Sequence, residues 1–215
     1  MLGHIITHEA AAWFAACEAD NTRDFWARER ASYDRHVKAP LLELLRASGE
    51  DVAHWRVYRP HRDTRFSPTA APLKTFLGAL QVQRDGTGRY LQVDRRGLLA
   101  SSGLPYLAPD QLPRWRQAVD GDRGQVLDDA LSTARGAGLR IKSGYPEPLK
   151  RVPRGHDPQH PRADLLRWKG IEAYARLPLE PADQPSWLSG TWDGGRAVCA
   201  WLALHVGATA LERSR

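Results

Sequence analysis

Cysteine and long apolar runs are both scarce in this chain. Its 215 residues include two cysteines, Cys17 and Cys199, which are too few for a disulfide framework or a cysteine metal cluster. The longest apolar run, residues 197–204, is far too short to cross a bilayer. Residues 1–20 lack the basic head and long apolar stretch of a signal peptide. We therefore expect a cytoplasmic protein with reduced thiols and no membrane partner.

Sequence signatures of phosphate binding and of nucleophilic catalysis are missing as well. Two glycine pairs, at residues 86–88 and 136–138, lack the surrounding pattern of a phosphate-binding loop. Neither the nucleophile elbow G-x-S-x-G nor a cysteine–histidine signature occurs. The sequence therefore predicts no cofactor and leaves open whether the protein is an enzyme.

Positive charge is present, and it is concentrated in two segments. Residues 54–74, the first basic segment, and residues 149–169, the second basic segment, each carry a net charge of +4. The whole chain carries +6, so the remainder is −2. Concentrated positive charge raises the local concentration of anionic ligands. The alternative, that these arginines pair with acids elsewhere in the fold, stays open.

The periodicity of apolar residues predicts helices at both ends of the chain and in its middle, with strands between them. Helices are expected at residues 7–20, 21–49, 109–119, 125–135, 162–168 and 196–205, with Asn21 as the cap of the second and Pro40 kinking or restarting it. Strands are expected at residues 55–58, 75–83, 89–93, 97–102 and 171–176, and loops at 60–72, 146–161 and 178–195. This pattern predicts an α+β fold, a single globular domain over residues 1–215 whose antiparallel sheet is covered by N-terminal, middle and C-terminal helices.

The first basic segment contains the pattern R-x-x-R-D-x-R-F at residues 59–66. This pattern resembles the signature of domain-of-unknown-function family 2461, a bacterial family. The resemblance continues through residues 21–40, 149–170 and 201–207, and it implies no particular activity. Where family members carry an acidic residue, a lysine and a tyrosine after the first motif, this chain has Thr69, Ala70 and Leu73. If those groups perform chemistry in the family, this member has lost it.

Polar and charged residues of the two basic segments form the predicted ligand-binding set. They are Arg59, Arg62, Asp63, Arg65, Lys74, Lys150, Arg154, His156 and His160. Arginine presents a planar fork of donors that suits carboxylates and phosphates, although the same fork can clamp carbonyls and brace a loop. Asp63 lies between two arginines, which lower the pKa of a carboxyl group and make it a poor general base. We therefore expect Asp63 to orient Arg62 or Arg65.

His156 and His160 are four residues apart, which on a helix could place both on one metal ion. Pro158 and Pro161 argue against a helix here, and no second cluster of ligands is visible, so we expect no metal site. The two histidines could instead transfer protons near neutral pH or cap the helix that follows.

Three hypotheses of function remain. The leading one is that the two basic segments converge and bind an anionic, phosphate-bearing small molecule. The second is an enzyme that uses Asp63, His156 or His160 as acid, base or metal ligand. The third is that the arginines only brace the fold. Nucleic acid is a less favoured partner, because the aromatic residues beside the basic segments are more often packing groups than stacking platforms. The sequence gives no indication of oligomeric state.

Overall fold

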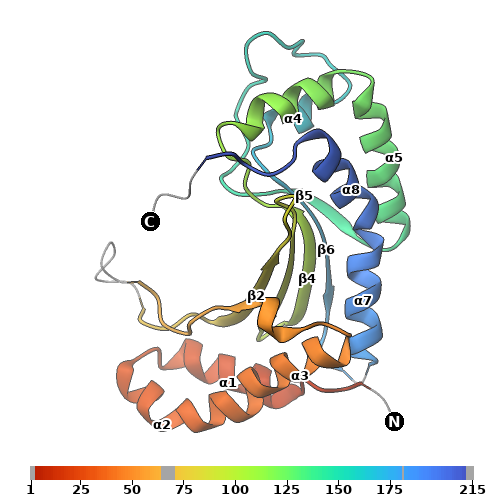
Figure 1. Ribbon diagram of the computed structural model, residues 1–215. Helices are drawn as coiled ribbons and strands as arrows, with labels where there is room; N and C mark the ends of the chain where they lie inside the picture. The colour runs from red at the N-terminus through yellow and green to blue at the C-terminus, as the bar shows by residue number, and fades with distance from the viewer. Residues whose placement is uncertain (1–2, 64–70, 181, 212–215) are drawn as a thin grey trace. The chain divides into compact units, whose positions relative to one another are not determined.

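A computed structural model describes residues 3–63, 71–180 and 182–211 (Figure 1). Its strands form a six-stranded antiparallel sheet in the order β1-β2-β3-β4-β6-β5, with helices before, between and after them. The predicted α+β class is confirmed. Within the described ranges, none of the helices has the length and apolar character needed to cross a bilayer.

The strands and helices have the following bounds. The strands are β1 (Arg56–Val57), β2 (Phe76–Val82), β3 (Gly88–Asp94), β4 (Gly97–Leu104), β5 (Arg140–Ser143) and β6 (Ile171–Leu177). The helices are α1 (His8–Ala19), α2 (Arg23–Tyr33), α3 (Ala39–Ala47), α4 (Gln111–Asp120), α5 (Arg123–Gly136), α6 (Ala163–Arg167), α7 (Gln184–Gly194) and α8 (Arg196–His205).

The chain forms two compact units. Unit 1 comprises Met1–Gln81, Tyr90–Ala100 and Arg176–Gly190, and unit 2 comprises Val82–Arg89, Ser101–Ala175 and Thr191–Arg215. The organisation of residues 1–215 as a single domain stays a prediction, and each unit is described by itself.

In unit 1, α1 and α2 pack around an aromatic cluster. α1 begins after Thr7, as predicted, and buries Ala10, Trp13, Phe14 and Cys17, a spacing that places all four on one helix face. The ring centroids of Trp13 and Tyr33 lie 5.0 Å apart, within the range of favourable aromatic pairs. This cluster fixes the helix face that later forms one wall of a pocket.

A π-helical turn at Asp34–Lys38 joins α2 to α3. Pro40, in the first turn of α3, lacks an N–H, and its ring would collide with the carbonyl four residues earlier in a regular helix. A wider turn just before Pro40 relieves both problems, and π turns of this kind occur often at functional sites. The predicted restart of the helix at Pro40 is confirmed.

In unit 2, two buried tryptophans join the helices. Trp115 of α4 and Trp201 of α8 meet edge to face, with ring centroids 5.8 Å apart. Each indole N–H finds a backbone carbonyl: Trp115 Nε1 donates to Leu165 O at 3.0 Å, and Trp201 Nε1 donates to Arg123 O at 2.9 Å. The large rings are therefore buried without leaving a polar group unpaired.

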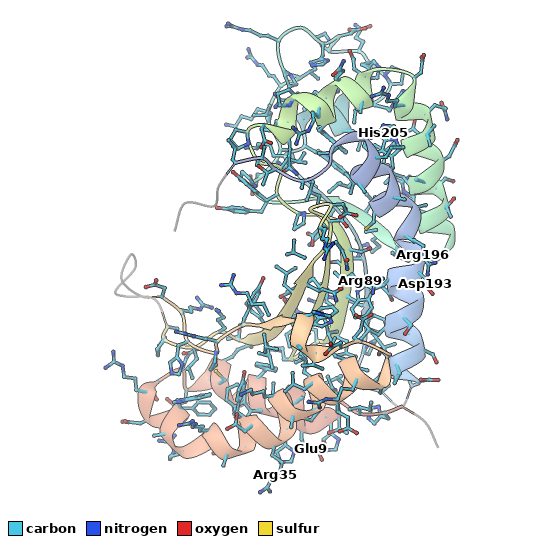
Figure 2. The ribbon with its side chains drawn as sticks, viewed as in Figure 1. Glu9, Arg35, Arg89, Asp193, Arg196 and His205 are labelled. Atoms are coloured by element: carbon cyan, nitrogen blue, oxygen red, sulfur yellow. The ribbon has the colours of Figure 1, made fainter. Side chains whose placement is uncertain are left out.

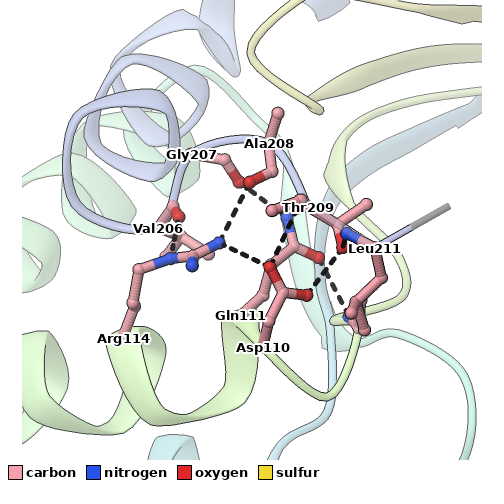
Figure 3. Close-up of polar contacts among 10 residues, drawn as sticks. Asp110, Gln111, Arg114, Val206, Gly207, Ala208, Thr209 and Leu211 are labelled. Atoms are coloured by element: carbon pink, nitrogen blue, oxygen red, sulfur yellow. Dashed lines mark hydrogen bonds and ion pairs between the residues drawn. The ribbon is translucent and has the colours of Figure 1, made fainter.

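Polar side chains from the start of α4 hold the segment after α8 (Figure 3). Gln111 Nε2 donates to Gly207 O and Arg114 Nε donates to Val206 O, both at 2.6 Å. Asp110 accepts from Thr209 Oγ1 at 2.6 Å. These bonds satisfy carbonyls that the end of a helix otherwise leaves unpaired, and they anchor the chain after His205.

Two predictions about the elements were wrong, and one strand was missed. Thr22 rather than Asn21 caps α2, since Thr22 Oγ1 accepts from Phe25 N at 3.1 Å. The predicted loop at residues 178–195 contains α7, whose first residue, Gln184, is fully buried and accepts from Ile6 N at 2.8 Å. β5 was missed because its sequence, Arg-Ile-Lys-Ser, is mostly polar and alternates too weakly to predict a strand. In α7 and β5, contacts with residues distant in sequence outweigh the local pattern.

Candidate functional site

The two basic segments lie in different units, the first in unit 1 and the second in unit 2. Their convergence on one ligand stays a prediction. The site residues are therefore described one unit at a time.

Beyond the sheet, two stretches of the first basic segment run antiparallel to each other. β1 pairs with β2 through Val57 and Ala79, and beyond the strands Arg62 N donates to Pro72 O at 2.8 Å. Lys74 N donates to Pro60 O at the same distance. The main-chain bonds hold Arg59 and its neighbours in a fixed register, although they lie outside the regular strands.

Asn21 ties this segment to the beginning of α2. Its Oδ1 accepts from Leu73 N at 2.8 Å, and its Nδ2 donates to Leu73 O at 3.1 Å. A side-chain amide carries both a donor and an acceptor, so it can pair with one residue as a neighbouring strand would. Helix capping was the role predicted for Asn21; its bonds to Leu73 could not be predicted, because that partner is 52 residues away.

A pocket of about 540 Å³ lies between this segment and the helices of unit 1. We call it the β1 pocket, and it is lined by Trp26, Arg30, Tyr33, Asp34, Lys38, Val57, Tyr58, Arg59, Pro60 and His61. Its volume falls within the range of about 300–1,000 Å³ that is usual for small-molecule sites. Asp34 is the one carboxylate among the described lining residues, against Arg30, Lys38 and Arg59. The pocket therefore joins aromatic walls to an excess of positive charge.

Two of the predicted arginines are available to a ligand. Arg59 and Arg62 are both exposed. Asp63, the expected orienting partner, is also exposed and has an interaction of its own, and Arg65 lies outside the described residues. The orientation of Arg62 or Arg65 by Asp63 stays a prediction.

Lys74 is held inside this positive region. Its Nζ donates to Arg59 O at 2.9 Å and lies 5.4 Å from the ring centroid of Tyr58. Burial lowers the pKa of Lys74, and the positive charges of Arg56 and Arg62 lower it further. The direction of these effects means that positive charge here is not fully neutralised by nearby acids.

Of the described residues that line the β1 pocket, Arg59 alone was in the predicted set. Among the others, Trp26, Arg30 and Lys38 come from α2 and the π turn, a stretch for which only helical structure was predicted. A signal was present, because residues 26, 30, 34 and 38 follow one another at intervals of four and so lie along one face of a helix. The sequence does not show that this face is opposite the basic segment.

In unit 2, His156 and His160 both approach Asp120, the last residue of α4. His156 Nδ1 lies 3.2 Å from Asp120 Oδ2, and His160 Nε2 lies 3.7 Å from Asp120 Oδ1. His160 Nδ1 also accepts from the backbone N of Arg162, the residue directly before α6, at 3.0 Å. This supports the capping alternative for His160. No group of three or more His, Cys, Asp or Glu side chains in the described ranges has the arrangement of a metal site.

Other cations of the second basic segment are engaged within the fold. Arg162 Nε donates to Val119 O at 3.1 Å and so satisfies a carbonyl near the end of α4. Arg167 pairs with Asp164. Lys150 and Arg154 are exposed, and Lys150 lines a shallow pocket of about 450 Å³ together with Arg151 and Arg167. In the second basic segment, the cationic side chains of Arg162 and Arg167 therefore form contacts within the fold.

Comparisons with known proteins give a family but no activity. The sequence model of DUF2461, described as conserved hypothetical protein, matches residues 9–200 of the chain. No curated protein and no solved structure matches. The family match covers most of the 215 residues and includes both basic segments. The resemblance inferred from the sequence motifs is confirmed: the chain belongs to the conserved hypothetical protein family DUF2461.

Proposed function

We propose that this protein binds an anionic, phosphate-bearing small molecule in the β1 pocket. The observation that carries the proposal is the composition of the pocket wall, where Arg30, Lys38 and Arg59 face one carboxylate, Asp34, among the described lining residues. Guanidinium groups present paired donors that match phosphate oxygens. A pocket of about 540 Å³ has room for the organic part of such a ligand beside the rings of Trp26 and Tyr58.

The contacts suggest a different role for each member of the first basic segment. Arg59 contacts the ligand together with Arg30 and Lys38. Lys74 positions the backbone of Arg59 through its bond to the Arg59 carbonyl at 2.9 Å. Arg62 lies outside the pocket wall, and its charge attracts the anion toward it. Asp63 is an exposed member of the same segment, and Arg65 lies outside the described residues.

Residues of the second basic segment enter the proposal in a smaller way. Lys150 and Arg154 are exposed cations of unit 2, and their charge attracts the same class of anion. His156 and His160 hold their loop against Asp120. We also propose a reducing compartment, the cytoplasm, because Cys17 and Cys199 are both free thiols.

The test is a binding titration with matched arginine variants. Arg59→Ala and Arg30→Ala should each weaken binding of a nucleotide or sugar phosphate by about 10- to 150-fold, the cost of one charge-assisted hydrogen bond. Arg35→Ala is the control, because it removes the same charge at another position. Arg35 is exposed, and its side chain points away from the first basic segment (Figure 2). Isothermal titration calorimetry measures all three variants against the parent.

Two results would count against the proposal. One is that no phosphate ester, tested together with inorganic phosphate, binds or raises the melting temperature of the parent protein. The other is that Arg59→Ala and Arg30→Ala bind as tightly as Arg35→Ala does. In either case the arginines of the first basic segment serve the fold alone.

A further inference from the structure

A second, smaller pocket lies within unit 2. We call it the Cys199 pocket, and its volume is about 260 Å³. It is lined by Gln83, Asp85, Thr87, Gly88, Arg89, Ser102, Trp192, Arg196, Cys199 and Ala200. Figure 2 shows Arg89 at the beginning of β3 near Asp193 and Arg196, where α7 gives way to α8. Neither the basic segments nor the family motifs include these residues.

This pocket is lined by a buried hydroxyl group whose one neighbouring hydrogen-bonding group in the described structure is a thiol. Ser102 of β4 is 4% exposed, and its Oγ makes no hydrogen bond of ordinary geometry there; it interacts only with the thiol of Cys199, a weak partner. Buried polar groups nearly always have a partner, because leaving one unpaired costs free energy. Ser102 and Cys199 both line the cavity, so a molecule that enters it can supply the stronger acceptor that the hydroxyl lacks.

The backbone of α7 and α8 leaves room for that hydroxyl. A Cβ atom on Gly195 would collide with Ser102 Oγ, so only glycine at this position lets the hydroxyl keep its place. The turn at the opposite rim is rigid, since Asp85 Oδ1 accepts from both Thr87 N at 2.9 Å and Thr87 Oγ1 at 2.7 Å. The pocket is therefore built before any ligand arrives.

Positive groups stand at its rim. Arg89 is half-buried, and its guanidinium carbon lies 5.5 Å from the ring centroid of Trp192, a stacking that fixes the orientation of the fork. Arg196 adds a second guanidinium and pairs with Asp193. The carboxylate of Asp85 is held by Thr87. An anion is the ligand that such a rim favours.

We propose that the Cys199 pocket binds a small organic carboxylate, which pairs with Arg89 and accepts a hydrogen bond from Ser102. The pocket is too small for larger ligands, because its volume of about 260 Å³ is below the usual range of about 300–1,000 Å³ for sites that bind drug-sized molecules. A compact carboxylate of a few heavy atoms fits, whereas a nucleotide does not. This site is independent of the β1 pocket and of the function proposed for it.

Cys199 supplies a reporter for the site. Burial raises the pKa of its thiol, and Asp85 raises it further, while the Ser102 hydroxyl and Arg89 act in the opposite direction. The thiol is therefore neutral at physiological pH, where it neither repels an anion nor acts as a strong nucleophile. Cys17 is fully buried in unit 1, and burial raises its pKa to about 11. It serves as an internal control in the same molecule.

The experiment measures alkylation of both cysteines by iodoacetamide in the full chain, resolved by mass spectrometry. Succinate and malonate are the carboxylate probes, and inorganic phosphate is the comparison anion. Succinate or malonate should slow alkylation of Cys199 saturably, by about fivefold or more, without changing the rate at Cys17. Ser102→Ala should raise the concentration needed for protection by about tenfold. Its melting temperature should stay close to that of the parent, because the hydroxyl it removes contacts only the thiol of Cys199, a weak hydrogen-bond partner.

Four outcomes would overturn the proposal. Equal protection of Cys17 would mean general stabilisation of the fold rather than occupation of the pocket. Protection by phosphate but not by either carboxylate would assign another ligand class. Unchanged protection in Ser102→Ala would remove the hydroxyl from the site. Marked destabilisation of Ser102→Ala without ligand would show that the hydroxyl already has a strong partner within the fold.

Discussion

Asp94 shows how a single carboxylate in unit 1 is stabilised in its charged form. It is 9% exposed, and its oxygens accept from Arg176 NH2 at 2.9 Å, from Gln92 Nε2 at 2.8 Å and from Arg96 N at 2.8 Å. Burial alone raises the pKa of this group, but the hydrogen bonds from Arg176, Arg96 and Gln92 outweigh it and the pKa falls below its usual value. Asp94 therefore stabilises the fold through its negative charge.

We predict that Asp94→Asn lowers the free energy of unfolding at neutral pH by about 2–3 kcal/mol, less than the loss of a fully buried pair because Arg176 is partly exposed. The pKa is lower in the folded state, so the stabilisation is complete above the unfolded value of about 3.9. It is lost as the pH falls through the folded pKa. Urea melts of both proteins from pH 7 downward should therefore converge in acid.

Asp164→Asn is the control for this prediction. Asp164 also pairs with an arginine, Arg167, but its side chain is 77% exposed. Exposed pairs contribute roughly 0–1 kcal/mol, so this variant should melt almost as the parent does at every pH. A difference between Asp94→Asn and the parent that stays constant down to the acid transition would contradict the assigned role of the charge.

At the scale of elements, the sequence pattern predicted the helices and strands whose own residues show a clear apolar periodicity. α1 has four buried residues at helical spacing, and β2, β3, β4 and β6 appeared where strands were expected. α7 contains Gly190 and Gly194, which both disfavour a helix. It forms nonetheless, because Gln184 bonds to the backbone of Ile6 from 178 residues away. The sequence of residues 178–195 alone does not show the bond between Gln184 and Ile6.

The candidate site shows the same division between residues that the sequence pattern predicts and residues whose role depends on distant contacts. Arg59 was found because it belongs to a dense local motif, and it does line the β1 pocket. Arg30 and Lys38 were not found, because their role depends on which face of α2 is opposite the basic segment. The residue that fixes this arrangement is Asn21, through its two bonds to Leu73. Its function depends on a contact that the sequence does not reveal.

We predict that Asn21→Ala loosens the first basic segment and weakens ligand binding. The change removes two hydrogen bonds from the backbone of Leu73, each worth about 0.5–1.5 kcal/mol, and so lowers the free energy of unfolding by about 1–3 kcal/mol. Phosphate-ester affinity should fall as well, because the segment must then be ordered when the ligand binds. Calorimetry and denaturant melts give the two quantities.

The neighbouring residue provides the control. Thr22→Ala removes the cap of α2, which should cost a similar amount, about 1 kcal/mol, without touching the basic segment. Ligand affinity should therefore fall in Asn21→Ala but not in Thr22→Ala. Equal affinities for the two variants would mean that Asn21 contributes to the fold alone.

At the scale of the whole molecule, the position of charge matters more than its total. A net charge of +6 spread evenly would bind anions weakly everywhere. Instead the first basic segment alone carries +4, and there burial and the charges of Arg56 and Arg62 lower the pKa of Lys74. Positive charge that lacks nearby acids is screened by salt, over a Debye length that shrinks from about 10 Å at 0.1 M to 3 Å at 1 M.

We therefore predict that affinity for a phosphate ester falls several-fold when sodium chloride rises from about 0.05 to 0.5 M. The more distant cations provide the salt-sensitive part, because charges in direct contact with the ligand are screened less. Arg62→Ala, whose residue lies outside the pocket wall, should consequently flatten the slope of log Kd against log salt concentration more than it changes Kd at high salt. Arg35→Ala has the same net charge and should keep the parent slope. If the two variants gave equal slopes, binding would follow net charge, and the concentration of charge in the first basic segment would have no separate effect.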